Sequence, residues 1–152
     1  MASYSFKDIA SAIAGPGGTV DFGMGSGAAE EGITFERTED HNTMVTGADG
    51  SVMHSLHVAD SGTVRVRLLK TSVINGQLMN MYKAQKISAN VWGQNTIELR
   101  DRTRQDKIVC SEVAFTGPPT VSYGKVGAVQ EWLFHAGHIE MTLDFGTPPP
   151  AV

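Results

Sequence analysis

The chain has 152 residues, of which 41% are hydrophobic and 18% charged, a composition that suits one domain with a buried core and excludes general disorder. A net charge of −4 and a pI of about 5.7 disfavour a nucleic-acid-binding domain. The single cysteine, Cys110, excludes an intrachain disulfide. No apolar run approaches the roughly 20 residues that a membrane helix needs, so no membrane partner is expected.

Charge is distributed unevenly along the chain. Residues 1–60 carry −7, residues 61–107 carry +6 and residues 108–152 carry −3. Acidic and basic blocks within one small domain can form complementary faces for self-association. The alternative is that folding mixes the two blocks on one surface.

The N-terminal third predicts short strands separated by turns. Residues 4–13 form the first expected strand, and the glycines and proline of residues 15–18 end it. A weak strand follows near Val20 and Phe22, and residues 23–32 read as a loop of small residues. From Ile33, apolar and polar residues alternate as far as Thr38, which indicates a half-buried strand.

Residues 43–47 and 51–58 flank the sequence Ala48-Asp49-Gly50 and predict a long hairpin. Asp-Gly favours a tight turn, because both central residues can adopt positive φ. Residues 63–69 then alternate well, with Val64, Val66 and Leu68 on a face opposite to Arg65 and Arg67.

The periodicity changes over residues 73–88, which predicts the only substantial helix. Its apolar stripe has the spacing of one helical face and consists of Ile74, Leu78, Met81, Tyr82 and Gln85. Ser72 is the expected N-cap, and two lysines in the last turns complement the helix dipole.

Strands are expected again at residues 95–100, 107–115 and, briefly, 121–123. In the last long run the apolar residues are even-numbered up to Ala136 and odd-numbered from Ile139, so Gly137-His138 should hold a bulge or bend. The predicted fold is mainly β: an antiparallel β-sandwich or barrel with one packed helix.

The sequence shows no catalytic or metal-binding pattern. His54 and His57 would lie on opposite faces of a strand, and His135 and His138 alone are too few for a zinc site. Cys110 is expected to be buried and inert. We therefore expect no enzyme, no metal and no cofactor, and we interpret the basic residues mainly as partners in ion pairs rather than as a nucleic-acid site.

Five segments carry a resemblance to a known family: residues 27–34 (GAAEEGIT), 47–57 (GADGSVMHSLH), 66–72 (VRLLKTS), 92–97 (WGQNTI) and 131–137 (EWLFHAG). Over about residues 3–146 the chain resembles the tail tube proteins of contractile-tailed bacteriophages. The resemblance implies a single tail-tube-like domain over residues 1–146, followed by a short proline-rich tail at residues 147–152. Val73 departs from the family pattern, in which proline is expected at the first helical position.

The resemblance also implies a function. Tail tube proteins form hexameric rings that stack into a hollow tube, the inner tube of the tail, through which DNA passes into the host. The implied partners are copies of the same chain, the sheath protein, baseplate and tail terminator proteins, and the tape measure protein and DNA in the lumen. The implied location is the virion, after assembly in the host bacterial cytoplasm.

Two groups of residues are the expected sites. The hairpin is the expected arm between rings or subunits, with candidate residues Thr43, Met44, Asp49, Gly50, Val52, Met53 and Leu56. Glu36, Arg65 and Arg67 are expected either to face the lumen or to form an ion-pair face. Six chains at −4 each would give a ring −24, which would discourage DNA from adhering if the acidic residues face the lumen.

Two alternatives remain open at this point. The chain could be the tube protein of a related contractile secretion or bacteriocin particle, because the fold alone does not separate that particle from a phage tail. It could also be a monomeric β-barrel that binds a small ligand, which would require a cavity with an apolar lining.

Overall fold

The computed structural model describes residues 9–22, 28–102 and 105–143. These residues form nine strands and one helix: β1 (Ile9–Gly15), β2 (Gly18–Asp21), β3 (Ala28–Arg37), β4 (Asn42–Thr46), β5 (Val52–Leu56), β6 (Gly62–Leu69), α1 (Ile74–Lys86), β7 (Asn95–Asp101), β8 (Lys107–Phe115) and β9 (Val129–Thr142). Positions 4–8 of the first predicted strand, positions 23–27 of the predicted loop and the tail at 147–152 lie outside the described residues. The mainly β, antiparallel fold with a single helix is as predicted.

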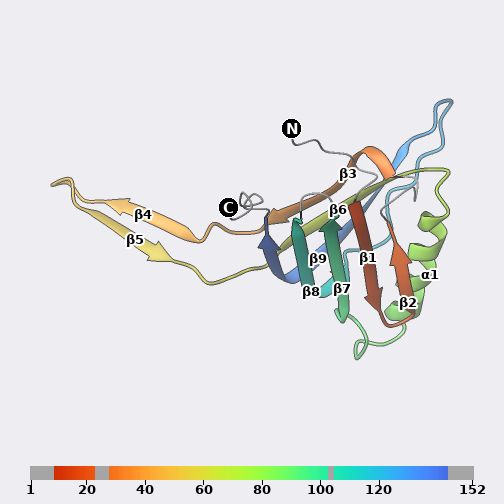
Figure 1. The fold of residues 1–152 in the computed structure, drawn as a ribbon, viewed down its shortest axis with the longest axis horizontal. Helices are drawn as coiled ribbons and strands as arrows, with labels where there is room; N and C mark the ends of the chain where they lie inside the picture. Colours follow the sequence, from red (N-terminus) through yellow and green to blue (C-terminus); the bar gives the residue numbers. More distant parts are fainter. Residues whose placement is uncertain (1–8, 23–27, 103–104, 144–152) are drawn as a thin grey trace, which may run out of the picture.

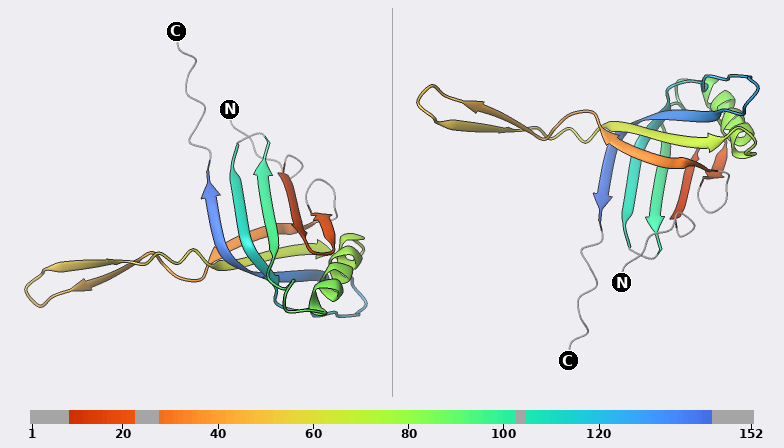
Figure 2. Two further views of the ribbon diagram at one scale, coloured as in Figure 1. Left: turned by 90° about the horizontal axis from the view of Figure 1, so that it is seen from below. Right: turned by 90° about the horizontal axis from the view of Figure 1, so that it is seen from above.

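Seven strands form one antiparallel sheet in the order β2-β1-β7-β8-β9-β6-β3, and β4 and β5 form a separate hairpin. The large sheet folds over on itself, so that β3, β6 and the first part of β9 run across β1, β7, β8 and the second part of β9 (Figure 2). The apolar core lies between these two layers. The hairpin projects from one end of the molecule, whereas α1 lies at the other end (Figure 1).

Strand β9 joins the two layers. Residues 129–136 pair with β6, and residues 134–142 pair with β8. The buried side chains of β9 switch from Trp132, Phe134 and Ala136 to Ile139, which confirms the predicted change of face near Gly137. The β8–β9 register is unbroken there; the irregularity falls instead between β7 and β8, where Glu112 adopts φ 54°.

The core is tightly filled. Trp132, Phe22 and Phe134 are all less than 2% exposed, and the Phe115 ring lies against both Phe134 and Trp132 at centroid distances of 4.9 and 6.1 Å. At the corner where β3, β6 and β9 meet, the backbone passes so close that a Cβ on Gly62 would lie 2.3 Å from the Glu36 carbonyl oxygen. Only glycine fits at this corner.

Helix α1 docks across the end of the layers through the predicted stripe, and all five of its residues are buried. Asn75 and Gln85 fix the two ends of the helix. The indole N–H of Trp132 donates to Asn75 Oδ1 at 3.0 Å, and Gln85 and Asn95 exchange amide hydrogen bonds at 2.6 and 2.8 Å. Paired amides of this kind can be buried without an unsatisfied donor.

Several predictions about local structure are wrong. Residues 121–123 form no strand, because Pro118, Pro119 and two nearby glycines interrupt an irregular 116–128 loop. Strand β3 begins at Ala28, inside the segment predicted to be a loop. The N-cap position of α1 is occupied by Val73, which has no capping side chain, although the Ile74 N–H donates to Ser72 Oγ at 3.3 Å.

Candidate assembly interface

The β4–β5 hairpin is the most exposed element of the structure. All five residues of β4 are exposed, as are four of the five in β5. The two strands pair with each other from Asn42–Leu56 to Thr46–Val52, and the hairpin extends away from the body (Figure 1). A two-stranded hairpin that stands alone in water is marginally stable, so this one is suited to packing against another surface.

The turn between the strands differs from the expected one. Asp49 does not adopt positive φ, whereas Gly50 does at 91°. The Gly50 N–H donates to the Gly47 carbonyl at 3.0 Å, and the Gly47 N–H donates to the Ser51 carbonyl at 2.7 Å, which closes a three-residue loop. The Ser51 backbone N–H donates to Asp49 Oδ1 at 3.0 Å, and this hydrogen bond lowers the pKa of the Asp49 carboxyl group.

Apolar side chains occupy both faces of the hairpin. Cross-strand pairing puts Met44, Val52 and Leu56 on one face. Val45 and Met53 lie on the other face, directly opposite each other in the register. Met53 is 60% exposed and Leu56 is 80% exposed, so neither face is covered by the body of the protein. Exposed apolar surface on this scale is characteristic of an interface.

The structure brings all seven candidate hairpin residues together in this element. Met44, Val52, Met53 and Leu56 are its exposed apolar side chains, and Asp49 and Gly50 form its turn. Thr43 is polar and close to His57, with Oγ1 and Nε2 2.7 Å apart. Sequence reasoning missed Val45 and Val58; Val45 could have been found from its alternation with Met44 on the second face.

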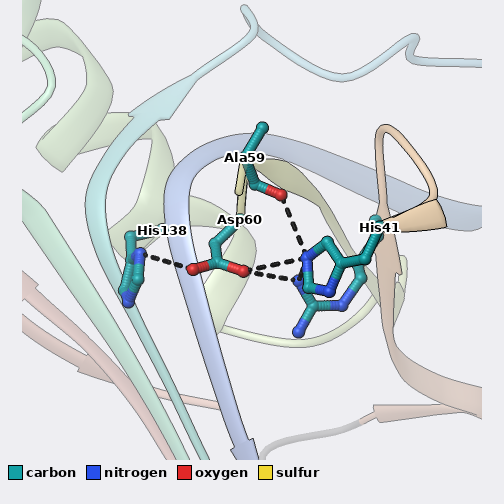
Figure 3. A network of polar contacts seen from close by, with 5 residues as sticks. His41, Ala59, Asp60 and His138 are labelled. Atoms are coloured by element: carbon teal, nitrogen blue, oxygen red, sulfur yellow. Dashed lines mark hydrogen bonds and ion pairs between the residues drawn. The ribbon is translucent and has the colours of Figure 1, made fainter. Parts of the chain in front are cut away.

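The base of the hairpin is held by an ionic cluster around Asp60 (Figure 3). Arg37 Nη1 donates to Asp60 Oδ1 at 3.0 Å, and His41 Nε2 lies 3.0 Å from the same oxygen and 3.1 Å from the Ala59 carbonyl. His138 Nδ1 lies 3.4 Å from Asp60 Oδ2. The hydrogen bond from Arg37 is the main reason why the pKa of Asp60 is lowered. Residues from β3, the hairpin stem and β9 thus meet at one carboxylate.

The second candidate group lies on the outer face of β3 and β6. Arg67 Nε donates to Glu131 Oε2 at 2.8 Å, and Arg65 Nη1 lies 3.6 Å from Glu131 Oε1. Glu36 lies on the same outer face, opposite Thr63 in the β3–β6 register. Arg65 and Arg67 therefore form ion pairs with Glu131 of the neighbouring strand. Ion pairing also occurs on β7, where Arg100 Nη2 lies 3.2 Å from Glu98 Oε1.

The described residues show no arrangement suited to catalysis or metal binding. His54 and His57 contact Asn42 and Thr43 respectively, on opposite faces of the hairpin. No group of three or more potential metal ligands occurs among the described residues. Burial raises the pKa of the Cys110 thiol to about 11, so it is protonated at neutral pH. No helix in the described part of the chain is long and apolar enough to cross a membrane.

The space between the layers does not resemble a ligand site. A cleft beside Ile33, Phe35 and Ile108, which Asp101 and Asp106 also line, has a volume of about 200 Å³, below the roughly 300–1,000 Å³ typical of small-molecule pockets. Clefts of about 450, 370 and 310 Å³ are lined partly by exposed polar side chains. The buried apolar side chains of the described residues pack into one cluster. This packing counts against the ligand-binding barrel.

The fold is shared with proteins of contractile injection machines. The solved structures that resemble the chain include the sheath/tube terminator of the extracellular contractile injection system PVC in its extended state (13% identity, TM-score 0.58, covering 93% of this chain and 98% of that one). They also include the tube-terminating cap of the anti-feeding prophage AFP (12%, 0.51, 94% and 94%) and a chain of the PVC sheath–tube complex (12%, 0.51, 88% and 88%). At these identities the likeness concerns the fold.

The family is shown by sequence. The family model of the bacteriophage PhiTE tail tube protein matches residues 1–144, and the chain belongs to this family of structural, non-enzymatic proteins. A comparison with curated proteins found no match.

Proposed function

We propose that the chain forms stacked hexameric rings of the inner tube of a contractile phage tail, with residues 1–146 as the tube domain and 147–152 as a short tail. The observation that carries the proposal is the projecting hairpin with exposed apolar side chains on both faces. In this arrangement the hairpin is the arm between neighbouring subunits or rings. The apolar side chains that the arm exposes in the monomer are then buried against a neighbouring subunit in the assembly.

The outer strands of the sheet provide further support. Strands β2 and β3 end the seven-stranded order, so each has one edge without a neighbour among the described strands. In a ring, such edges can pair with the next copy and are then no longer exposed. The tube would therefore be built from sheet extension within rings and arm contacts between rings.

The proposed passenger of the lumen is DNA. A ring of six copies at −4 each would carry −24, which disfavours adhesion of a polyanion to the wall. Arg65 and Arg67, the basic side chains of the β6 outer face, both pair with Glu131, which offsets part of their positive charge. The proposed partners outside the tube are the sheath, baseplate and terminator proteins, and the tape measure protein occupies the lumen before DNA. The proposed location is the virion, with assembly in the host bacterial cytoplasm.

The proposal is tested by introducing a charge into the arm. Met53→Asp should leave the far-UV spectrum unchanged and shorten or abolish tubes in electron micrographs, because a carboxylate cannot be buried unpaired in an apolar contact. Met53→Leu is the matched control, because it keeps an apolar side chain of similar volume. Normal tube length for Met53→Asp would contradict the assignment of the hairpin as the arm.

A second candidate function is that of a tube terminator, favoured by the terminator and cap proteins among the structural neighbours. A terminator would form one ring and stop, whereas a tube protein would add ring upon ring. Mass measurement of the assembled particles separates the two: particles of a single ring support a terminator, and particles of many rings support a tube protein.

A further inference from the structure

We infer that the arm of one copy docks on the opposite end of a second copy, on a surface formed by the 69–73 turn and the 116–128 loop. This inference rests on the proposed function and names the surface that receives the arm. The receiving surface, here called the helix end, contains six exposed apolar side chains: Leu69, Val73, Val121, Tyr123, Val126 and Val129.

Two sets of contacts connect the parts of this surface. Leu69 and Val129 are directly paired in the β6–β9 register. Lys70 lies over the Tyr123 ring, 3.4 Å from its centroid, and its ammonium group also donates to the Ser122 carbonyl. The 116–128 loop is thereby tied to the start of the helical segment. Tyr123 and Val126 are 85% and 81% exposed, so no part of the described body covers them.

The two surfaces carry opposite charge. Between Thr38 and Val64 the chain contains four acidic residues and no lysine or arginine: Asp49 lies in the turn of the hairpin, Glu39 and Asp40 precede its first strand, and Asp60 is paired with Arg37 at its base. Residues 68–97 and 113–130, which contain α1 and the helix end, carry four lysines and no acidic residue; the lysines are Lys70, Lys83, Lys86 and Lys125. Opposite charge between two apolar patches favours their association and fixes its orientation.

Charge also decides which surface can bind the arm. Two arms meeting each other would bring acidic residues, Asp49 among them, against like charges, which is unfavourable. An arm cannot reach the helix end of its own copy, because the two lie at opposite ends of the long axis (Figures 1 and 2). A second copy therefore supplies the helix end. Each copy then gives one arm and receives one, the head-to-tail arrangement that generates open filaments.

The charge argument is tested at Val126, in the full chain, with two substitutions that both replace a valine by a charged residue. Val126→Asp should reduce the amount of sedimentable assembly about tenfold more than Val126→Lys, because only the aspartate opposes the acidic arm. Equal losses for the two variants would overturn the proposed charge complementarity.

The contact itself is tested by cross-linking. Met53→Cys and Val126→Cys copies are mixed and treated with a short bis-maleimide; Cys110 is buried, with a pKa of about 11, and should remain unmodified. The prediction is a cross-linked pair containing one copy of each variant, and a ladder of multimers from the double variant. Thr96→Cys, an exposed position on β7, replaces Val126→Cys in the control mixture and should give no such pair.

The outcomes separate this inference from the proposed function. Tubes in electron micrographs without a Met53→Cys to Val126→Cys link would overturn the receiving surface and leave the tube function standing. Links between two Met53→Cys copies would overturn the head-to-tail contact. The absence of both rings and links at high concentration, with preformed tube seeds present, would overturn the tube function and this inference together.

Discussion

At the scale of single residues, the buried amide pair is the most exacting feature of the body. Gln85 and Asn95 are both fully buried, and their amides also donate to the carbonyls of Pro16 and Val113 at 2.8 and 3.0 Å. This small network joins α1, the β1–β2 turn, β7 and β8. Gln85 lies on the apolar stripe of α1, so its burial could be predicted from periodicity, whereas its partners could not.

We expect Gln85→Leu to lower the free energy of unfolding by about 1–3 kcal/mol, because it leaves the Asn95 amide buried without its partner. Urea denaturation monitored by tryptophan fluorescence measures the loss. Gln77→Leu, at an exposed position of the same helix, is the control and should change stability by less than about 0.5 kcal/mol. Equal effects would show that the network contributes little.

A second residue-scale prediction concerns Cys110. Its pKa of about 11, raised by burial, keeps the thiol protonated at neutral pH. A thiol-specific reagent at pH 8 should modify it slowly in the folded protein and rapidly in urea. Equal rates in the two conditions would contradict a buried position in β8.

At the scale of elements, the arm depends on the Asp60 cluster at its base. The carboxylate joins Arg37 of β3, His41 beside β4 and His138 of β9. Two backbone hydrogen bonds also hold the base of the arm to the body: the Thr38 N–H donates to the Ser61 carbonyl, and the Ile139 N–H donates to the Asp60 carbonyl. The orientation of the arm relative to the body is thus set by contacts from three strands.

The lowered pKa of Asp60 fixes the direction of the pH effect. A carboxyl group whose pKa is depressed by folding stabilises the folded form above its unfolded value, near 3.8, and loses that contribution as the pH falls through its folded value. Exchange protection of the Thr38 amide should therefore persist to about pH 4 and fall in stronger acid. Asp60→Asn should show reduced protection already at neutral pH. Wild-type protection in Asp60→Asn would contradict this function of the cluster.

The sequence predicted those elements whose periodicity is set by burial. The five-residue stripe of α1 and the alternation of β6 are clear because one face of each element packs on the core. The boundaries of β8 were also correct. The prediction of a strand at residues 121–123 was wrong because Val121 and Tyr123 alternate with polar residues as in a strand but are exposed, with Val121 46% and Tyr123 85% accessible.

The sites were only partly predictable. The hairpin could be located from Asp49-Gly50, but its projection from the body and the apolar character of both faces are tertiary features. The Asp60 cluster joins Arg37 to His138 across a hundred residues, so no local pattern indicates it. The Glu131 partner of Arg65 and Arg67 likewise follows from the β6–β9 register, which the sequence alone did not specify.

At the scale of the whole molecule, the two ends of the long axis differ in the surfaces that they present. The β4–β5 hairpin and α1 lie at opposite ends (Figure 1). The hairpin end carries apolar faces and acidic residues, and the helix end carries an apolar patch and lysines. A monomer that functioned alone would expose both surfaces to water. Stacked copies would cover them, which is why this polarity favours a repeating assembly over a solitary subunit.

Salt should reveal how much of the assembly depends on charge. If the acidic arm meets the basic helix end, raising the ionic strength from about 0.01 M to 1 M shortens the screening length from about 30 to 3 Å and should slow assembly. Light scattering after a concentration jump gives the rate. The same rate at low and high salt would indicate contacts that are apolar only.

The most direct test of the tube function is electron microscopy of the purified full chain at high concentration, with and without preformed tube seeds. We predict six-fold rings or stacked tubes with a central hole, whose helical reconstruction places the β4–β5 hairpin against the adjoining ring. A strict monomer that fails to extend added seeds would contradict the account.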